Sequence, residues 1–321
     1  GSEMCIRDSP TRRGTLVAVD DISFSIAPGE VLGVVGESGA GKSMTGAAVI
    51  GLLEPPGRIA GGSIALDGRR IDNLPYEEMR KVRGREIGAI FQDPLTSLNP
   101  LYTIGRQLTE TILTHLPVSP AEAQARAVDL LRQVGIPAAE KRIDHYPHQF
   151  SGGMRQRVVI ALALAANPKL IIADEPTTAL DVSIQAQIIA LIKKLCREHG
   201  AAVMLVTHDM GVIAETADRV AVMYAGRIAE IGPVRDVIKA AKHPYTEGLM
   251  ASIPKVGRTD ARLAQIDGAM PRLNAIPPGC AFNPRCGRVH DRCRHDRPDP
   301  MGVGASQVAC WLYDAAKEGA R

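Results

Sequence analysis

Three things are scarce in this 321-residue sequence: aromatic side chains, net charge and long apolar runs. Aromatic residues make up only 3% of the chain, which disfavours a surface that stacks nucleic-acid bases. The formal net charge of +3 is too weak to indicate nucleic acid or an anionic membrane as a partner. No apolar run approaches the roughly 18 residues that span a bilayer, and no charged-then-apolar leader is visible. We therefore expect a cytosolic chain that meets a membrane only through a partner.

The apolar runs that do occur alternate with helical stretches. Val31–Val35 is continuously apolar, as in a strand buried on both faces, and Val158–Ala166 is typical of a buried helix. Strands that alternate with helices predict an α/β fold with a largely parallel sheet. Between Pro94 and Phe150 the pattern becomes helical, most clearly at Ala121–Val134. The further strand candidates are Leu16–Ile26, Ile87–Phe91, Leu170–Ala173, Val203–Val206 and Val220–Met223.

A glycine-rich loop follows the first buried strand candidate and reads Gly36-Glu-Ser-Gly-Ala-Gly-Lys-Ser43. With a strand before it and a helix after it, this pattern is specific for a phosphate-binding loop. Its backbone N–H groups and the helix N-terminus favour phosphate, Lys42 is expected to reach the β- and γ-phosphates, and Ser43 to ligate Mg²⁺. The predicted nucleotide-binding residues of the loop are Gly36, Glu37, Ser38, Gly39, Ala40, Gly41, Lys42, Ser43 and Met44.

An acidic pair, Asp174-Glu175, ends the strand candidate Leu170–Ala173. A carboxylate at the end of a buried strand is well placed to hold Mg²⁺, so Asp174 is a predicted magnesium ligand. Glu175 beside it is suited to accept a proton from the attacking water, as a general base must.

A second phosphate-suited helix start lies upstream of the acidic pair. Ser151 is a natural helix N-cap, and Gly152 and Gly153 expose backbone N–H groups at the positive end of the helix. Because the loop around Lys42 already encloses its own phosphate, this surface predicts a second copy that faces the first.

Together these motifs resemble the ABC transporter ATPase family over about residues 11–235. In family order, the resemblance adds Gln92 as the Q-loop glutamine, Asp181 in the D-loop and His208 as the switch histidine. The signature sequence departs from the usual pattern at Phe150 and Met154. Neither change removes the cap or the glycines, so we expect the chain to be active.

The resemblance implies a head-to-tail dimer with two ATP molecules between one subunit's phosphate loop and the other's signature, which includes Ser151, Gly152 and Gly153. It implies Glu175 as the base, His208 as a contact of the γ-phosphate, and Gln92 as a residue that orients water or Mg²⁺. The implied magnesium ligands are Ser43, Gln92 and Asp174. The family usually stacks adenine on an aromatic residue about 25 positions before the loop. Residues 10–15, where this aromatic would lie, contain none.

Three segments are similar to one branch of the family, the oligopeptide/dipeptide (and nickel) importer ATPases: residues 92–100, 243–246 and 279–286. The stretch 44–51 is closer to one of the two paralogous ATPases of that branch, which points to a heterodimer. The resemblance implies an ATP-hydrolysing subunit at the cytoplasmic face of the membrane that drives the uptake of di- and oligopeptides. The implied partners are the paralogous ATPase, two transmembrane permeases and, indirectly, an extracytoplasmic solute-binding protein.

Four of the six cysteines, Cys280, Cys286, Cys293 and Cys310, fall in the last 42 residues. In a reducing cytosol such clustering suggests a metal site more than disulfides, and four thiolates suffice for a 4Fe–4S cluster or a zinc ion. The spacing fits neither a ferredoxin run nor a zinc ribbon, so the iron–sulfur interpretation comes from the family resemblance. A Zn²⁺ site and free thiols remain alternatives. Cys196 is expected to be a packed core residue.

We expect three segments along the chain: residues 1–9, an ATPase domain over 10–242 with a helical subdomain at about 94–157, and a C-terminal extension over 243–321. Residues 4–9, back-translated, resemble a sequencing-adapter end, so we interpret residues 1–9 as non-native; a disordered native tail is the alternative.

Three other functions compete with peptide import. A soluble ABC ATPase of translation or DNA repair generally has two cassettes or long coiled-coil inserts, and this chain has one cassette and neither insert. An importer of nickel or another non-peptide solute remains an alternative within the branch. A regulator that binds nucleotide without hydrolysis is disfavoured by Glu175 and His208. The basic run Arg80–Arg85 lacks interleaved aromatics and is interpreted as a solvated helix end, so no nucleic-acid partner is expected.

Overall fold

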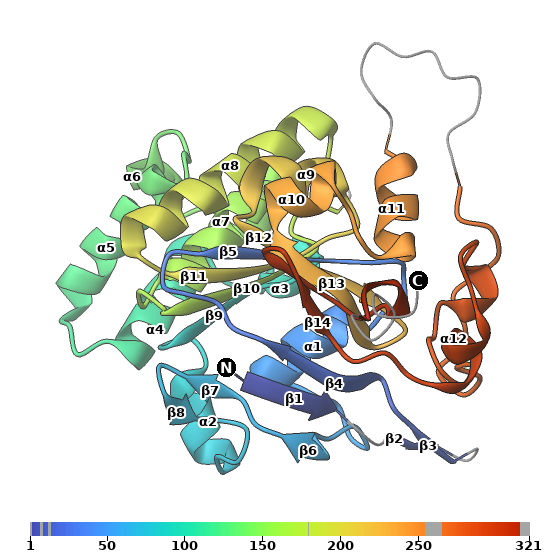
Figure 1. Ribbon diagram of the computed structural model, residues 1–321. Coiled ribbons are helices and arrows are strands. Elements are labelled where there is room, and N and C mark those ends of the chain that lie inside the picture. Colours follow the sequence, from blue (N-terminus) through green and yellow to red (C-terminus); the bar gives the residue numbers. More distant parts are fainter. Residues whose placement is uncertain (1, 7–8, 12–13, 179, 254–264, 315–321) are drawn as a thin grey trace. The chain divides into compact units, whose positions relative to one another are not determined.

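The computed structural model describes residues 2–6, 9–11, 14–178, 180–253 and 265–314, and through residue 15 it describes the backbone alone. The chain forms two compact units, each assembled from segments that are separate in the sequence. Figure 1 shows the helices and strands along the chain. Strands and helices alternate along both units, which confirms the predicted α/β class. Unit 1 comprises Gly1–Ser25, Leu32–Asp72 and Thr207–Arg321, and unit 2 comprises Ile26–Val31 and Asn73–Val206.

The main sheet of unit 1 has the strand order β14-β15-β13-β12-β5. β5 pairs in parallel with β12, and the pairs from β12 to β14 are antiparallel. All five residues of β5 are buried, which explains why its sequence is continuously apolar instead of alternating. The strands are β5 (Val31–Val35), β12 (Arg219–Tyr224), β13 (Arg227–Pro233), β14 (Met301–Val303) and β15 (Ser306–Val308).

The smaller strands of unit 1 form a three-stranded sheet, β4-β1-β6, and two hairpins. The predicted strand Leu16–Ile26 is shorter in the structure, where β4 covers Val19–Phe24 and Leu16 ends β3. Asp21 inside β4 has a positive φ of 54°. β1 lies within residues 1–9, whose non-native origin stays a prediction. These strands are β1 (Ser2–Ile6), β2 (Ser9–Thr11), β3 (Gly14–Leu16), β4 (Val19–Phe24), β6 (Gly61–Gly62), β7 (Ala65–Leu66) and β8 (Arg69–Arg70).

The C-terminal part of unit 1 holds more regular structure than its sequence pattern indicates. β15 pairs with β13, with Val308 opposite Glu230, so the extension adds two strands to the main sheet. Elements of three to eight residues are too short to show a period, which is why the sequence did not reveal them. The helices of unit 1 are α1 (Lys42–Val49), α9 (Met210–Thr216), α10 (Val234–Lys239), α11 (Pro244–Ala251) and α12 (Asp291–His295), with 3₁₀ turns at Asn283–Arg285 and Trp311–Tyr313.

A buried carboxylate attaches the start of α11 to the sheet. Glu230 on β13 is fully buried, and its carboxylate accepts hydrogen bonds from the backbone N–H groups of Lys242 and His243 at 3.0 and 2.9 Å. Such charge-assisted bonds compensate for the burial of the acid. They fix the entry to α11, which carries Tyr245.

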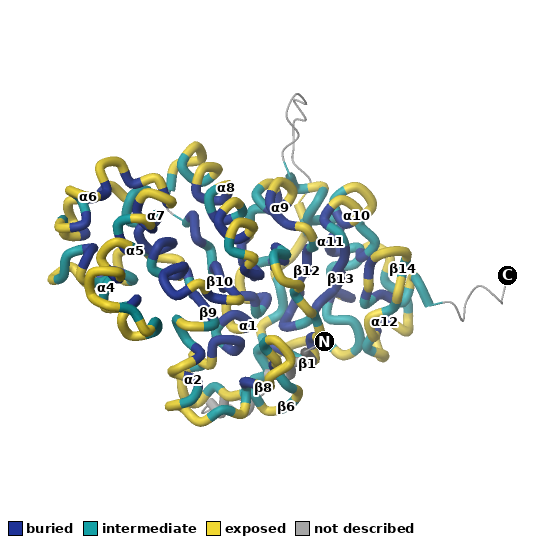
Figure 2. Tube along the Cα trace, turned by 90° about the vertical axis from the view of Figure 1, so that its left-hand side faces the viewer, coloured by how far each residue is buried: buried dark blue, intermediate teal, exposed yellow. Residues whose placement is uncertain are grey.

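Unit 2 contains a parallel sheet with the strand order β11-β10-β9. In β10, Leu170 lies opposite Ala202 of β11 and Ile87 of β9, and the first four residues of β10 are buried (Figure 2). All three predicted strands are confirmed, with ends that differ by one residue. They are β9 (Ile87–Ile90), β10 (Leu170–Asp174) and β11 (Ala202–Val206).

Helices make up the rest of unit 2, as predicted for the region after Pro94. Helix α5 has a complete capping box between Ser119 and Glu122 and confirms the clearest predicted helix. Helix α7 continues to Leu164, so the predicted subdomain end at residue 157 falls inside a helix. The helices are α2 (Tyr76–Val82), α3 (Pro94–Ser97), α4 (Ile104–His115), α5 (Pro120–Gln133), α6 (Ala139–Arg142), α7 (Gly152–Leu164) and α8 (Val182–His199), with a 3₁₀ turn at Pro147–Gln149.

Within the described residues, no helix is both long enough and apolar enough to cross a membrane. The basic run after residue 79 belongs to the exposed end of α2, where Arg80 and Lys81 form ion pairs with Glu77 and Glu78. Arg85 instead donates to the carbonyl of Ala166 at 2.8 Å. The predicted solvated helix end is thus confirmed up to Val82.

Candidate nucleotide-binding and catalytic site

The loop between β5 and α1 turns through three glycines that have positive φ angles. Gly36, Gly39 and Gly41 have φ values of 152°, 83° and 101°. A Cβ atom at Gly36 would lie 2.2 Å from the carbonyl oxygen of Met223, and one at Gly41 would lie 3.0 Å from that of Ala18. Both the backbone conformation and the available space therefore require glycine at Gly36 and Gly41.

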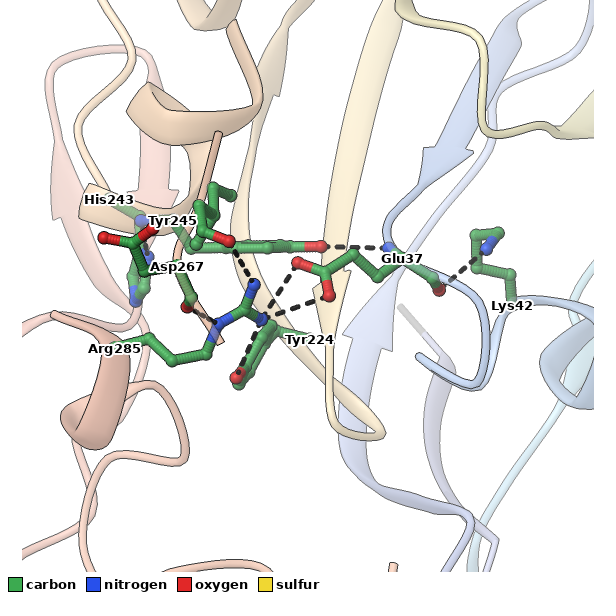
Figure 3. A network of polar contacts seen from close by, with 8 residues as sticks. Glu37, Lys42, Tyr224, His243, Tyr245, Asp267 and Arg285 are labelled. Carbon is green, nitrogen blue, oxygen red and sulfur yellow. Dashed lines mark hydrogen bonds and ion pairs between the residues drawn. The ribbon is translucent and has the colours of Figure 1, made fainter. Parts of the chain in front are cut away.

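The amino group of Lys42 forms hydrogen bonds with the backbone at the start of this loop. Lys42 is 6% exposed, and its Nζ donates to the carbonyl oxygen of Gly36 at 2.8 Å. It also donates to the carbonyl oxygen of Glu37 at 3.1 Å (Figure 3). The N-cap residue of α1 is Gly41, which has no side chain to cap the helix, and the first turn has no acidic residue. Ser38, Gly39 and Ser43 are exposed along the loop. A lysine beside an exposed, positively polarised helix start can bind an anion such as phosphate.

Glu175 stands at the end of β10 in a backbone conformation that is rare for a residue with a side chain, with a φ of 46°. Its N–H donates to the carbonyl of Val206 at 2.9 Å. Its Oε2 accepts hydrogen bonds from Gln92 Nε2 at 3.2 Å and from Thr178 Oγ1 at 3.0 Å. The structure thus brings together two residues that the sequence analysis assigned to catalysis, Glu175 and Gln92, and holds the carboxylate in one orientation.

Thr178 is a contact of the acid that the sequence analysis missed. The backbone N–H of Thr178 also donates to the carbonyl of Glu175 at 3.2 Å, so the turn after Glu175 brings the hydroxyl back to the carboxylate. The signal was present in the sequence, since a threonine three residues after an acid in Glu-Pro-Thr-Thr suits such a turn.

Helix α7 begins with the predicted cap. Ser151 Oγ accepts a hydrogen bond from the N–H of Met154 at 3.4 Å, and Ser151 and Gly152 are exposed. Gly153 is tightly packed, because a Cβ there would lie 3.0 Å from Cγ2 of Ile184. The exposed start of α7 is therefore a second surface with the character of an anion site.

The remaining predicted residues occupy helix starts in the two units. Asp181 is the N-cap residue of α8, while Ala179 of the same motif lies outside the described residues. His208 is exposed and follows Thr207, whose N–H donates to the carbonyl of Val34 at 3.2 Å. Because Val34 is two residues before the glycine loop, this bond brings the backbone around His208 toward the loop within unit 1.

The predicted site is divided between the two units. Residues 36–44 and His208 belong to unit 1. Gln92, the acidic pair, the start of α7 and Asp181 belong to unit 2. The side chains of residues 10–15, where the adenine-stacking aromatic was sought, lie outside the described part of the structure.

The four C-terminal cysteines line one common pocket, together with His243 and Trp311. Burial raises the pKa of the Cys280 thiol to about 11 and raises the pKa values of Cys286 and Cys310. Among the described residues, however, no three His, Cys, Asp or Glu side chains are placed to hold one metal ion. Cys196, by contrast, is buried on α8, and burial raises its pKa to about 12, which confirms the predicted core position.

Comparison with known proteins agrees with this geometry. Residues 19–178 match the family model of ABC transporters, and residues 229–293 match that of the oligopeptide/dipeptide transporter C-terminal region. The oligopeptide transport ATP-binding protein AppD of Bacillus subtilis is 46% identical over 311 residues, which cover 96% of this chain and 94% of AppD. This chain belongs to the oligopeptide/dipeptide branch of the ABC transporter ATP-binding proteins. It is therefore an ABC-type ATPase.

Other relatives of this ABC ATPase give the same result. The dipeptide transport ATP-binding protein DppD of Escherichia coli is 48% identical over 281 residues, which cover 88% of this chain and 86% of DppD. The dimeric post-hydrolysis structure of the ATP-binding cassette MJ0796, bound to ADP and phosphate, is similar with a TM-score of 0.65 and 30% identity. It covers 73% of this chain and 98% of the cassette. The predicted family and the ABC cassette fold are thus confirmed.

Proposed function

We propose that this ABC ATPase hydrolyses ATP to drive the uptake of di- and oligopeptides across the cytoplasmic membrane. The observation that carries the hydrolytic part is the carboxylate of Glu175, held at the end of β10 by Gln92 and Thr178. The peptide cargo is supported by the match of residues 229–293 to the peptide-transporter C-terminal region and by relatives such as DppD and AppD.

In the proposed reaction, Glu175 accepts a proton from water as the water oxygen bonds to the γ-phosphorus, and the bond to the β-phosphate oxygen breaks. Lys42 and the N–H groups of the loop around it stabilise the charge that develops on the phosphate oxygens. The hydrogen bond from Gln92 Nε2 keeps the Glu175 carboxylate in position, and Gln92 also orients the attacking water. His208 contacts the γ-phosphate.

We assign Ser43, Gln92 and Asp174 to the binding of Mg²⁺. These residues fit the ion chemically, because a hydroxyl, an amide and a carboxylate offer the oxygen ligands that Mg²⁺ prefers. When bound, the ion would neutralise charge on the β- and γ-phosphates.

The exposed start of α7 supports the second half of the proposal, a partner ATPase. Ser151, Gly152 and Gly153 would contact the γ-phosphate held by the other subunit, and Asp181 would lie at the same interface. The proposed partner is a paralogous ATPase, bound with it to two permeases at the cytoplasmic face of the membrane and served by an extracytoplasmic binding protein. In this scheme residues 10–242 form the motor and residues 243–321 an extension.

For the four C-terminal cysteines we propose a 4Fe–4S cluster over a zinc ion. The four thiols line one common pocket, and four cysteine thiolates are the ligand set of such a cluster. A Zn²⁺ ion needs its sulfur ligands about 2.3 Å from one centre. Because burial raises the pKa values of Cys280, Cys286 and Cys310, cluster binding would release protons.

The hydrolytic role is tested by the substitution Glu175→Gln. We expect the turnover number to fall by about 10²- to 10⁴-fold, because an amide cannot accept the proton, while ATP still binds and holds the dimer together. Glu198→Gln is the matched control, since Glu198 lies on the exposed face of α8 beside Lys194. ATPase rates and ATP dissociation constants are measured for both. Turnover near the wild-type value in Glu175→Gln would remove this residue from the base role.

The cargo is tested on solubilised membranes that contain the tagged chain. Co-purification of two permeases and a paralogous ATPase, followed by ATPase stimulation with a peptide-loaded binding protein, supports peptide import. Stimulation by nickel alone would favour the non-peptide alternative. Recovery with ribosomes or DNA would contradict transport and leave the ATPase chemistry intact.

The cysteine site is tested by iron, sulfide and zinc analysis of anaerobically purified protein. We expect iron and sulfide, and their loss in Cys286→Ala but not in the control Cys196→Ala. Stoichiometric zinc, or no metal at all, would contradict the cluster.

A further inference from the structure

Tyr245 of α11 contacts the phosphate-binding loop directly, although the two are separated by more than two hundred residues. Its hydroxyl oxygen accepts a hydrogen bond from the backbone N–H of Glu37 at 2.9 Å (Figure 3). Tyr245 is fully buried, and its ring packs against Tyr224 and Phe282 with centroid distances of 4.6 and 5.4 Å. The hydroxyl is thus fixed in place by the packing of its ring against two other aromatic rings.

Arg285 holds the side chain of the same loop residue. Its Nη1 donates to both carboxylate oxygens of Glu37 at 3.0 and 3.1 Å, and the Arg285 side chain is only 7% exposed. The guanidinium also donates to the carbonyl oxygens of Asp267 and Ile266 at 2.8 and 3.2 Å. All of these partners belong to unit 1, so Arg285 ties three separate segments of that unit together (Figure 3).

A third contact comes from the segment that Arg285 anchors. A Cβ atom at Gly39 would lie 3.0 Å from the terminal methyl group of Met270. The extension therefore touches the loop at two positions, Glu37 and Gly39, through three of its own side chains.

Glu37, which Tyr245 and Arg285 of the extension contact, also accepts a hydrogen bond from Lys42 within the loop. The carbonyl oxygen of Glu37 accepts from Lys42 Nζ at 3.1 Å, while its N–H and carboxylate are bound by Tyr245 and Arg285. Every polar group of Glu37 is therefore engaged. A loop with three positive-φ glycines needs such restraint, because glycine allows the backbone many conformations and so does not by itself hold the loop in one of them.

We propose that the C-terminal extension braces the phosphate-binding loop and that Tyr245 and Arg285 are positioning residues for ATP binding. The inference rests on the proposed role of residues 36–43 as the phosphate site. The brace keeps the loop in its binding shape before ATP arrives, so its loss adds an ordering cost to binding. Because this cost is the same for bound ATP and for the transition state, the KM for ATP rises while kcat stays nearly constant.

The test uses Tyr245→Phe and Arg285→Lys in the full chain. Tyr245→Phe keeps the ring and removes the acceptor for the Glu37 N–H; Arg285→Lys keeps the charge and removes the guanidinium, whose Nη1 donates to both carboxylate oxygens of Glu37. We expect the ATP dissociation constant to rise about fivefold in Tyr245→Phe and about tenfold in Arg285→Lys. In the assembled transporter, kcat should change by less than about twofold.

Two side chains of the extension serve as matched controls. Arg288 pairs with Glu247, and the Tyr313 hydroxyl donates to the carbonyl of Lys242, so neither contact reaches the loop. Arg288→Ala and Tyr313→Phe should bind ATP as the wild type does. A double-mutant cycle between Arg285→Lys and Glu37→Gln should show coupling, because the two side chains act on each other.

Wild-type ATP affinity in both Tyr245→Phe and Arg285→Lys would overturn the brace, as would equal weakening in the controls. Lys42→Ala separates this outcome from a failure of the site itself. If Lys42→Ala loses ATP binding and the brace variants do not, the phosphate site stands and the brace is wrong. If Lys42→Ala binds ATP normally, the site assignment fails first.

Discussion

Helices α1 and α7 both begin at glycine-rich turns where phosphate binding is proposed, yet their N-termini are built differently. Helix α7 has its own cap, because Ser151 Oγ accepts from the N–H of Met154. Helix α1 starts at Gly41, which has no side chain, after a loop with three positive-φ glycines. Gly152 and Gly153 are ordinary helical residues at the start of α7.

The difference shows two ways to prepare a helix start for an anion. At α7, a side chain satisfies one N–H group and fixes the turn locally, so the surface is complete by itself. At α1, no side chain caps the first N–H groups, and the loop shape is fixed by Lys42 within the loop and by Tyr245 and Arg285 of the extension. A site that must enclose a phosphate cannot carry its own cap, since the cap would occupy the place of the ligand.

Between the two helix starts, the largest effect is expected from Lys42→Ala, which removes the only charged side chain of the α1 turn sequence Lys42–Thr45. ATP turnover should fall by about 10³-fold, because in the proposed mechanism Lys42 stabilises the charge on the transferred phosphoryl group. Lys194→Ala, on the exposed face of α8, should retain full turnover. Steady-state ATPase assays compare the two variants. Near-normal turnover in Lys42→Ala would mean that α1 is not the phosphate site.

Gly36→Ala and Gly152→Ala should change the free energy of unfolding by different amounts at the two helix starts. A Cβ at Gly36 would meet the backbone of Met223 at 2.2 Å, so we expect a loss of about 3 kcal/mol in the free energy of unfolding. At Gly152 the nearest atom would be Leu180 Cδ2 at 3.8 Å, so the change should stay within about 0.5 kcal/mol. Urea unfolding measures both. Equal stability of the two variants would contradict the comparison.

Ser151→Ala should cost less than Gly36→Ala, about 1 kcal/mol in the free energy of unfolding, because one helix cap is lost. Ser119→Ala is the matched control, since Ser119 caps α5 in the same unit and should cost a similar amount. Only Ser151→Ala should also reduce ATP turnover in the assembled dimer. A similar turnover in both variants would show that the start of α7 serves folding alone.

Sequence patterns predicted the strands of unit 2 and helix α5 to within one residue at each end, because their buried runs and caps are local signals. They predicted less of the extension, where β14, β15 and α12 are too short for a period to appear. The site followed the same division. Glu175 and Gln92 were each named from motif positions, but their hydrogen bond was not predicted, and Thr178 was missed although it stands three residues from the acid.

The sequence by itself determined the phosphate loop, the acidic pair and the cap of α7, since each depends on residues within one short segment whose chemistry is local. Only the tertiary structure decided that Arg285 holds Glu37, across 248 positions, and that Tyr245 accepts from the backbone of the same residue. Partners that distant share no spacing or period, so no pattern in the sequence records them. The rings of Tyr224, Tyr245 and Phe282 pack against one another beside the loop, and this packing brings the distant partners of Glu37 to it. Aromatic residues are otherwise scarce in this chain.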